Sequence, residues 1–205
     1  YINNHTHGDT RMTSKLKTDV LETVSGSGTI ALTNQLSGMT HASVPSGSVL
    51  QVTNNTRTHA DNLATTSATY IDSGLVTGAI TPLSAGSKIS VNIVGFFPHV
   101  NATANRGVCF QMFKSVNGGT YVKVTAGSVD GGFYDQADTA SWYDFSGTCS
   151  VFDTPTYTLG QTINYKLYYK YAHSSSSTYI NHMGGVLASG ANTVTTSISM
   201  TEIKG

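Results

Sequence analysis

The amino-acid sequence predicts an all-β protein, an antiparallel β-sandwich of the jelly-roll kind that is preceded by a short extended stem. Three observations carry this expectation. Only 11% of the 205 residues are charged, against roughly 25% in an average soluble domain. Ser and Thr fill the difference, at about a quarter of the chain. From Val49 onward, short runs of β-forming residues recur between Gly, Ser, Asn and Pro, and no segment of useful length shows the period of a helix.

The expected strands are short, and several alternate between apolar and polar residues. Ile163, Tyr165 and Leu167 share one face of their run, because side chains at positions i and i+2 of a strand point to the same side. The segments expected to form strands are 49–54, 68–72, 75–81, 88–98, 107–116, 119–126, 141–153, 163–172, 178–182 and 194–203. Eight to ten strands at roughly 10–15-residue spacing predict a sandwich or jelly roll. The sequence SVNGGTY between two of them predicts a hairpin turn.

Two regions differ in composition, and they predict a stem at residues 1–48 and a sandwich head at residues 49–205. Residues 1–13 are polar without periodicity, and residues 14–24 suit either a short helix or a strand. The first 48 residues hold too few large apolar side chains to offset a backbone ordering cost of ~1–2 kcal/mol per residue. We therefore expect identical copies around a symmetry axis to complete this segment.

The charge balance excludes several classes of partner. The formal net charge is zero and the isoelectric point is about 7.2. No basic patch offers the release of counterions that drives nucleic-acid binding, or attraction to an anionic membrane surface. No apolar run approaches the ~20 residues that span a bilayer. We expect neither nucleic-acid binding nor membrane insertion.

One segment combines aromatic rings with carboxylates, as a sugar-binding site requires. Within residues 127–145, rings could stack on the apolar faces of a sugar while acids accept its hydroxyl hydrogens, and loops at the end of a sandwich often carry binding. The candidate glycan- or receptor-binding residues are Tyr134, Asp135, Asp138, Trp142 and Tyr143. The alternative is that Trp142 begins a core strand and the aspartates are solvated turn formers.

Two other observations bear on chemistry. Cys109 and Cys149 lie in strand-like runs, either as buried thiols or as one disulfide between two strands. The chain has only two glutamates, Glu22 and Glu202, and no serine-hydrolase, zinc-protease or phosphate-binding motif. We therefore expect no enzymatic activity. A tail-associated polysaccharide depolymerase is kept as an alternative.

Three stretches carry a resemblance to a known group of proteins. They are residues 13–38, residues 46–93 with SGSVLQV, TYIDSGL, ITP and SKI in order, and residues 178–205 with the closing strand SISMTEI. The arrangement resembles the C-terminal domain of tail-fibre and related virion proteins of marine tailed phages. The resemblance implies a homotrimeric fibre in the virion tail, outside the cell. Its jelly-roll head would face the host and bind a surface glycan or protein, and its stem would contact other tail proteins.

The motif His5-Thr6-His7 predicts a metal site within such a trimer. Imidazoles at i and i+2 point the same way on an extended chain, and imidazole suits Fe, Zn, Cu and Ni. Three chains would present six imidazoles around one axis, as the similar His-x-His motif does in the fibre tips of contractile-tailed phages. We expect an Fe or Zn ion held on a three-fold axis by His5 and His7. The alternative is a terminal segment with two unrelated histidines, and a purely structural virion component remains an alternative for the whole chain.

Overall fold

A computed structural model describes most of the predicted head and the last few residues of the predicted stem. The described residues are 41, 43–59, 63–101, 106–124, 131–135, 142–144, 147–171, 178–180 and 193–205. They belong to one compact unit, Met39–Gly205. All regular structure among them is β-strand, so these ranges hold no helix that could cross a membrane.

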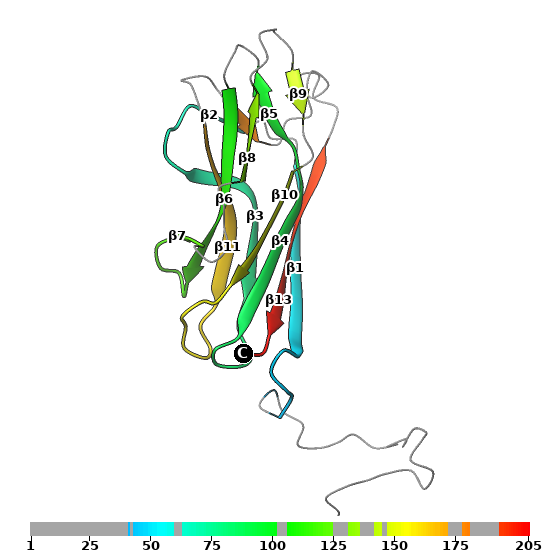
Figure 1. Ribbon diagram of the computed structural model, residues 1–205, viewed down its shortest axis with the longest axis vertical. Helices are drawn as coiled ribbons and strands as arrows, with labels where there is room; N and C mark the ends of the chain where they lie inside the picture. Colours follow the sequence, from blue (N-terminus) through cyan, green and yellow to red (C-terminus); the bar gives the residue numbers. More distant parts are fainter. Residues whose placement is uncertain are drawn as a thin grey trace, which may run out of the picture. The chain divides into compact units, whose positions relative to one another are not determined.

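Two antiparallel sheets face each other (Figure 1). The first sheet has the strand order β1-β13-β4-β10, formed by Val49–His59, Val194–Ile203, Lys88–Phe96 and Gly147–Asp153. The second sheet has the order β3-β11-β6-β7, formed by Ile71–Ile80, Ile163–Tyr171, Arg106–Val116 and Val122–Lys123. A further strand, β8 (Gly131–Asp135), pairs with the same edge of β6 as β7 does.

The strand order identifies a jelly roll. When β7 and β8 are counted as one interrupted strand, the eight main strands fall, by chain order, into sheets 1-8-3-6 and 2-7-4-5. This double Greek-key arrangement of two four-stranded sheets is the jelly-roll topology. The fold class predicted from the sequence is therefore confirmed.

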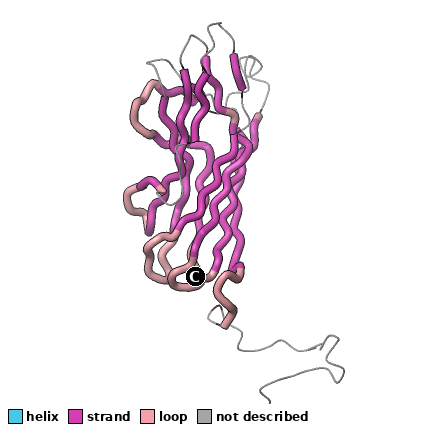
Figure 2. The backbone as a smooth tube through the Cα atoms, in the orientation of Figure 1, coloured by secondary structure: helices cyan, strands magenta, loops and turns pink. Residues whose placement is uncertain are grey.

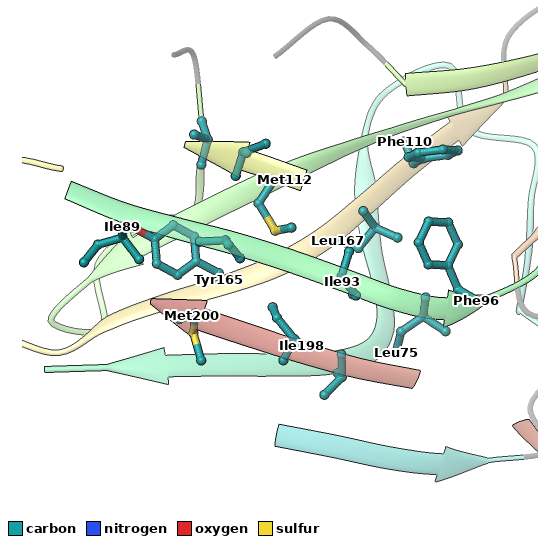
Figure 3. Packing of buried hydrophobic residues seen from close by; sticks show 14 of the residues in the cluster. Leu75, Ile89, Ile93, Phe96, Phe110, Met112, Tyr165, Leu167, Ile198 and Met200 are labelled. Carbon is teal, nitrogen blue, oxygen red and sulfur yellow. The ribbon is translucent and has the colours of Figure 1, made fainter. Parts of the chain in front are cut away.

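The core lies between the two sheets and follows the predicted alternation (Figure 3). Ile89, Val91 and Ile93 of β4 are fully buried, and so are Ile163, Tyr165 and Leu167 of β11. The side chains between them face outward, because successive residues of a strand point to opposite faces.

A third, smaller sheet stands at one end of the jelly roll. Its order is β2-β12-β5-β9, formed by Leu63–Thr65, Thr178–Ile180, Pro98–Asn101 and Trp142–Asp144. Each strand comes from one of the four connections that pass between the main sheets at this end, where β2, β5 and β9 lie in Figure 1. We call it the apical end. The order of the small sheet repeats that of β1, β13, β4 and β10, the main strands that these connections join.

The opposite, basal end holds both the start of β1 and the end of β13. The Gly47 amide donates to the Lys204 carbonyl (2.8 Å), and the Lys204 amide donates to the Ser48 carbonyl (2.9 Å). The Ser46 hydroxyl donates to the Gly205 carbonyl (2.7 Å). Figure 2 shows turns gathered at this end beside the C-terminus. The chain thus enters and leaves the jelly roll at the same end.

Several strands differ from the predicted ranges. β1 extends to His59 rather than ending at 54, although its second half is polar. Its backbone continues to pair with β13 as far as His59 opposite Val194. Side chains on its other edge add contacts with β3: Asn55 Nδ2 donates to the Thr77 carbonyl (2.9 Å), and Arg57 Nη1 donates to the Gly74 carbonyl. Tertiary contacts with a neighbouring strand thus override a weak local preference.

Other differences concern strand breaks. The run predicted at 75–81 and the last two residues of the run predicted at 68–72 fall in one strand, β3, whereas residues 68–70 precede it. The pairing of β3 with β11 shifts register between Lys166 and Tyr168. The run predicted at 141–153 is divided into β9 and β10. The short strands β2 and β8 were not predicted. The hairpin turn in SVNGGTY was predicted correctly. Asn117 and Gly118 both adopt positive φ, at 51° and 74°, as a two-residue hairpin turn requires.

Candidate functional site

The predicted glycan-binding residues lie in two short strands near the apical end. Tyr134 and Asp135 belong to β8, where Asp135 pairs with Arg106 at the start of β6. Trp142 and Tyr143 belong to β9, where Trp142 pairs with Asn101 at the end of β5. The two strands therefore adjoin the two ends of the β5–β6 connection. Asp138 lies outside the described residues.

The predicted metal site also lies outside the described residues, because His5 and His7 belong to the N-terminal segment. Within the described ranges, no group of three or more His, Cys, Asp or Glu side chains could hold a metal ion. The ion on a three-fold axis stays a prediction.

A cluster that the sequence analysis missed occupies the outer face of the second sheet. Four partly exposed rings follow one another, and we call them the aromatic row: Tyr121, Tyr168, Phe113 and Tyr70. The centroid distances along the row are 5.9, 4.2 and 5.6 Å, and the central rings of Tyr168 and Phe113 are stacked at 22°. Such ring pairs contribute about 0.5–1.5 kcal/mol beyond their buried area.

Strand geometry places these rings outward. Tyr168 alternates with the buried Leu167 and Tyr169 on β11, and Phe113 follows the buried Met112 on β6. The alternation in the sequence of β11 already predicts that Lys166, Tyr168 and Lys170 face outward. The other three rings, from β6 and from the segments before β3 and β7, come to lie beside Tyr168 through the register between strands, which the sequence does not state.

Lysines lie over both ends of the row. The Lys166 ammonium is 5.0 Å from the centroid of Tyr121, and the Lys170 ammonium is 4.7 Å from the centroid of Tyr70. Cation–π contacts of this kind contribute about 0.5–1 kcal/mol at exposed sites. Lys166 also forms an ion pair with Asp72 at 2.7 Å. A hydrogen bond to Asp72 raises the pKa of Lys166, so this lysine is charged at neutral pH.

A third lysine lies on this face. Lys123 of β7 stands directly opposite Phe113 in the register, and opposite residues of an antiparallel pair share a face. Burial raises the pKa of Tyr121 and of Tyr168, so both hydroxyls keep their protons at neutral pH. Among the described side chains, this face therefore offers rings, ammonium groups, hydroxyl donors and the Asp72 carboxylate.

Glu202 has a structural environment instead of a catalytic one. Its side chain is fully buried, and its two oxygens accept hydrogen bonds from several donors. The donors are Gln51 Nε2 (2.6 Å), Ser87 Oγ (2.6 Å), and the amides of Leu83 (2.9 and 3.0 Å) and Ser84 (3.1 Å). Burial acts to raise the pKa of Glu202, but these hydrogen bonds outweigh it and leave the pKa below its usual value. The carboxylate fixes the β3–β4 turn to β13.

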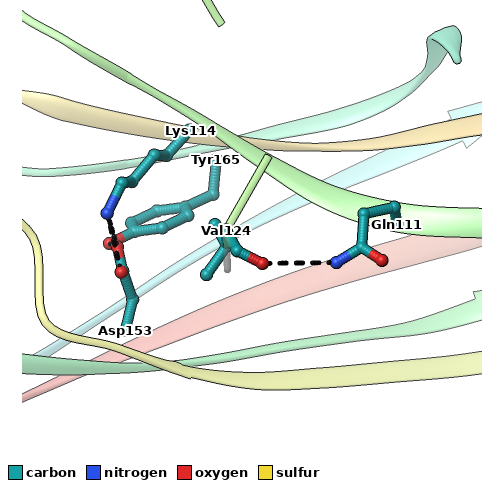
Figure 4. A network of polar contacts seen from close by, with 5 residues as sticks. All are labelled: Gln111, Lys114, Val124, Asp153 and Tyr165. Carbon is teal, nitrogen blue, oxygen red and sulfur yellow. Dashed lines mark hydrogen bonds and ion pairs between the residues drawn. The ribbon is translucent and has the colours of Figure 1, made fainter. Parts of the chain in front are cut away.

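A second buried network joins the two sheets (Figure 4). Lys114 Nζ of β6 lies 2.7 and 2.9 Å from the two oxygens of Asp153 on β10, and the Tyr165 hydroxyl of β11 donates to Asp153 at 2.8 Å. Burial, followed by the nearby Asp153 charge, raises the pKa of Tyr165, which stays protonated. The long contact from Gln111 Nε2 to the Val124 carbonyl (3.4 Å) lies nearby in the same view.

The cysteines are thiols and do not form the alternative disulfide. Cys109 lies in β6 of the second sheet and Cys149 in β10 of the first sheet. Burial raises the pKa of the Cys149 thiol to about 11, which leaves very little thiolate at neutral pH.

Comparison with known proteins gives remote structural likeness only. No protein-family model matches the sequence, and no curated protein matches it. A chain in the structure of the infectious bursal disease virus Gx strain is 17% identical, with 77% of this chain and 43% of that chain covered and a TM-score of 0.30. A chain of the Gt strain is 13% identical, with 77% and 42% covered and a TM-score of 0.24. The present chain thus spans less than half the length of either. The jelly-roll assignment rests on strand order and register.

Proposed function

We propose that this chain is the attachment head of a viral tail fibre, a non-enzymatic virion protein that binds a glycan or protein on the host-cell surface. The observation that carries the proposal is the separation of the two ends of the jelly roll. All four connections at the apical end build the third sheet, whereas residues 46–48 meet residues 204–205 at the basal end. A head attached through its base leaves the apical end exposed to a receptor, and scaffold loops of this kind often carry binding.

The apical strands β8 and β9 also hold four of the residues for which sequence chemistry predicts sugar binding: Tyr134, Asp135, Trp142 and Tyr143. Their placement at the end away from the chain entry supports a receptor-facing role. Many copies in one virion would then turn weak single contacts into strong adsorption.

The outer face of the first sheet supports association into a homotrimer. Three rows run across its four strands: Val52-Thr201-Ser90-Phe152, Asn54-Ser199-Asn92-Ser150 and Thr56-Ser197-Val94-Thr148. We call this surface the neutral face, because Lys88 is the one charged side chain among its described outward strand residues. Soluble surfaces are ordinarily about 25–35% charged, and charge is depleted where protein interfaces are buried.

Cell adsorption tests the attachment role. The purified full chain is expected to bind cells from a panel of marine bacteria, and the variant Trp142→Ala is expected to bind less at an unchanged melting temperature. Leu159→Ala, at an exposed basal position, serves as the matched control and should bind like wild type.

Two other results would change the proposal. Absence of binding to every cell surface, together with binding to purified virion proteins, would favour a purely structural virion component. Release of reducing sugars from capsular polysaccharide by the chain would favour a depolymerase.

A further inference from the structure

We propose that the aromatic row and its lysines bind an acidic polysaccharide, a sugar chain that carries carboxylate groups. This site lies on the side of the jelly roll, on the outer face of the second sheet, and it goes beyond receptor binding by the apical end. It does not depend on the third sheet, so either site can fail without the other.

The shape of the row suits an extended sugar chain. Its four rings come from two strands, β6 and β11, and from the residues that directly precede β3 and β7, and each ring lies within 4.2–5.9 Å of the next. All four residues are partly exposed. Lys166 and Lys170 lie over the two end rings, and the two central rings stack on each other, so a sugar chain would contact ring edges and the ring surface that these neighbours leave open. A continuous strip of rings fits a polymer better than it fits a single small molecule.

The charge of the face selects for an anion. Lys166 and Lys170 stand beside the Asp72 carboxylate among the described outward side chains, in a chain whose formal net charge is zero. Positive charge is thus concentrated beside the rings, whereas the neutral face on the other side of the sandwich has only Lys88. Lysines that lie over rings are held in place and lose less side-chain freedom when a carboxylate binds.

The hydrogen-bonding groups favour a carboxylated sugar over a nucleic acid. Asp72 can accept hydrogen bonds from sugar hydroxyls, and the hydroxyls of Tyr121 and Tyr168 are protonated and can donate. The phosphate backbone of a nucleic acid is also anionic, so charge alone does not separate the two ligands, and the preference for a sugar rests on its hydroxyl groups. Single-stranded nucleic acid is therefore the competing ligand that the experiment must include, because bases also stack on rings.

Isothermal titration calorimetry with the full chain tests the proposal. The acidic ligands are oligomers of polygalacturonate, alginate and hyaluronate, the neutral ligands are oligomers of dextran and amylose, and oligo(dT) represents single-stranded DNA. We expect at least one acidic oligomer to bind, with an affinity that falls as salt rises, and the neutral oligomers to bind at least tenfold more weakly.

Single substitutions assign the binding to this face. Lys170→Gln removes a charge, and Tyr168→Leu removes a ring while keeping apolar bulk; each should weaken binding of the acidic oligomer at least fivefold. Lys88→Gln removes the same charge from the neutral face and should leave the affinity unchanged. Leu159→Ala, at an exposed basal position, should also leave it unchanged. Circular dichroism and thermal unfolding of each variant verify that the fold is retained.

Four outcomes would overturn the proposal: no binding of any acidic oligomer, equal binding of the neutral oligomers, tighter binding of oligo(dT), or equal losses in Lys170→Gln and Lys88→Gln. If Lys170→Gln or Tyr168→Leu unfolds, Lys166→Gln takes its place with the same expected loss. Failure of cell adsorption with intact binding of the acidic oligomer would remove the attachment role alone.

Discussion

At the scale of single residues, Glu202 shows how a charge is held inside a chain that has few charges. In place of water, its carboxylate accepts hydrogen bonds from two backbone amides, one hydroxyl and one side-chain amide. Removal of the charge leaves these buried donors poorly matched, and a buried donor without a good acceptor costs about 1–3 kcal/mol.

We expect Glu202→Gln to lower the free energy of unfolding by about 2–4 kcal/mol, because an amide presents hydrogens to several of these donors. Asp72→Asn is the matched control: its carboxylate is partly exposed and pairs with Lys166 at the surface, where such a pair contributes about 0–1 kcal/mol. Denaturant unfolding measures both, and equal losses would contradict the structural role of Glu202.

The pH dependence follows from the same carboxylate. The pKa of Glu202 is lower in the folded state than the ~4.3 of a free glutamate. Its contribution is therefore fully present above about pH 4.3 and is lost as pH falls through the folded pKa. Wild type should lose stability with acidification more steeply than Glu202→Gln, and parallel curves would contradict this.

Cys149 gives a residue-scale prediction about reactivity. Since burial raises its pKa to about 11, we expect iodoacetamide at pH 8 to modify Cys149 far more slowly in the folded protein than after denaturation, because the thiolate is the reactive species. Peptide mapping by mass spectrometry measures the rate. Equal rates in the two states would show that the thiol is not protected.

At the scale of elements, one glycine allows β4 and β13 to approach closely near the apical end. Gly95 has a φ of +77°, and a Cβ placed there would lie 2.3 Å from the Thr195 carbonyl oxygen. Gly118 has a similar φ of +74° in the β6–β7 turn, with open space around it. The two positions thus separate the effect of close packing from that of the backbone angle.

We expect Gly95→Ala to cost about 3 kcal/mol or more, because backbone atoms must move. Gly118→Ala should cost about 1 kcal/mol, which reflects the positive φ alone. Thermal unfolding of both variants measures the difference, and similar losses would show that the contact at Thr195 relaxes easily.

The same scale shows what the sequence could and could not predict. β4 and β11 were found because each buries one face, so apolar residues alternate with polar ones. The second half of β1 was not found, because its polar side chains are used in contacts with β3 that only the folded chain provides. β8 begins with two glycines, which weaken a strand signal, and the short β2 has three residues. The aromatic row needs the register of β6 against β11, which no local pattern contains.

At the scale of the whole molecule, the neutral face leads to a prediction about association. Light scattering of the full chain should give three times the 21.6 kDa chain mass. Ser199→Arg places a charge in the middle row of this face and should dissociate the trimer, because a buried unpaired charge is costly. Leu159→Arg adds the same charge at the basal end and should remain trimeric. A single-chain mass for wild type would end the trimer proposal.

Metal content tests the predicted axial ion on the same sample. We expect about one Fe or Zn ion for three chains, as octahedral coordination by His5 and His7 from each chain requires. The double substitution His5→Ala and His7→Ala should abolish it, whereas His41→Ala, another histidine outside the strands, should retain it. Elemental analysis measures the ratio, and retention of metal in the double variant would contradict the site.

The meeting of residues 46–48 with residues 204–205 has a mechanical consequence. A tether pulling on Ser48 while a bound cell holds the apical end would load β1 along its length. β1 pairs with β13 from Val49 to His59. The load would therefore fall on all the hydrogen bonds between these two strands together instead of breaking them one at a time. Strands sheared in this way resist force far better than strands that are peeled apart, which would suit the proposed attachment head.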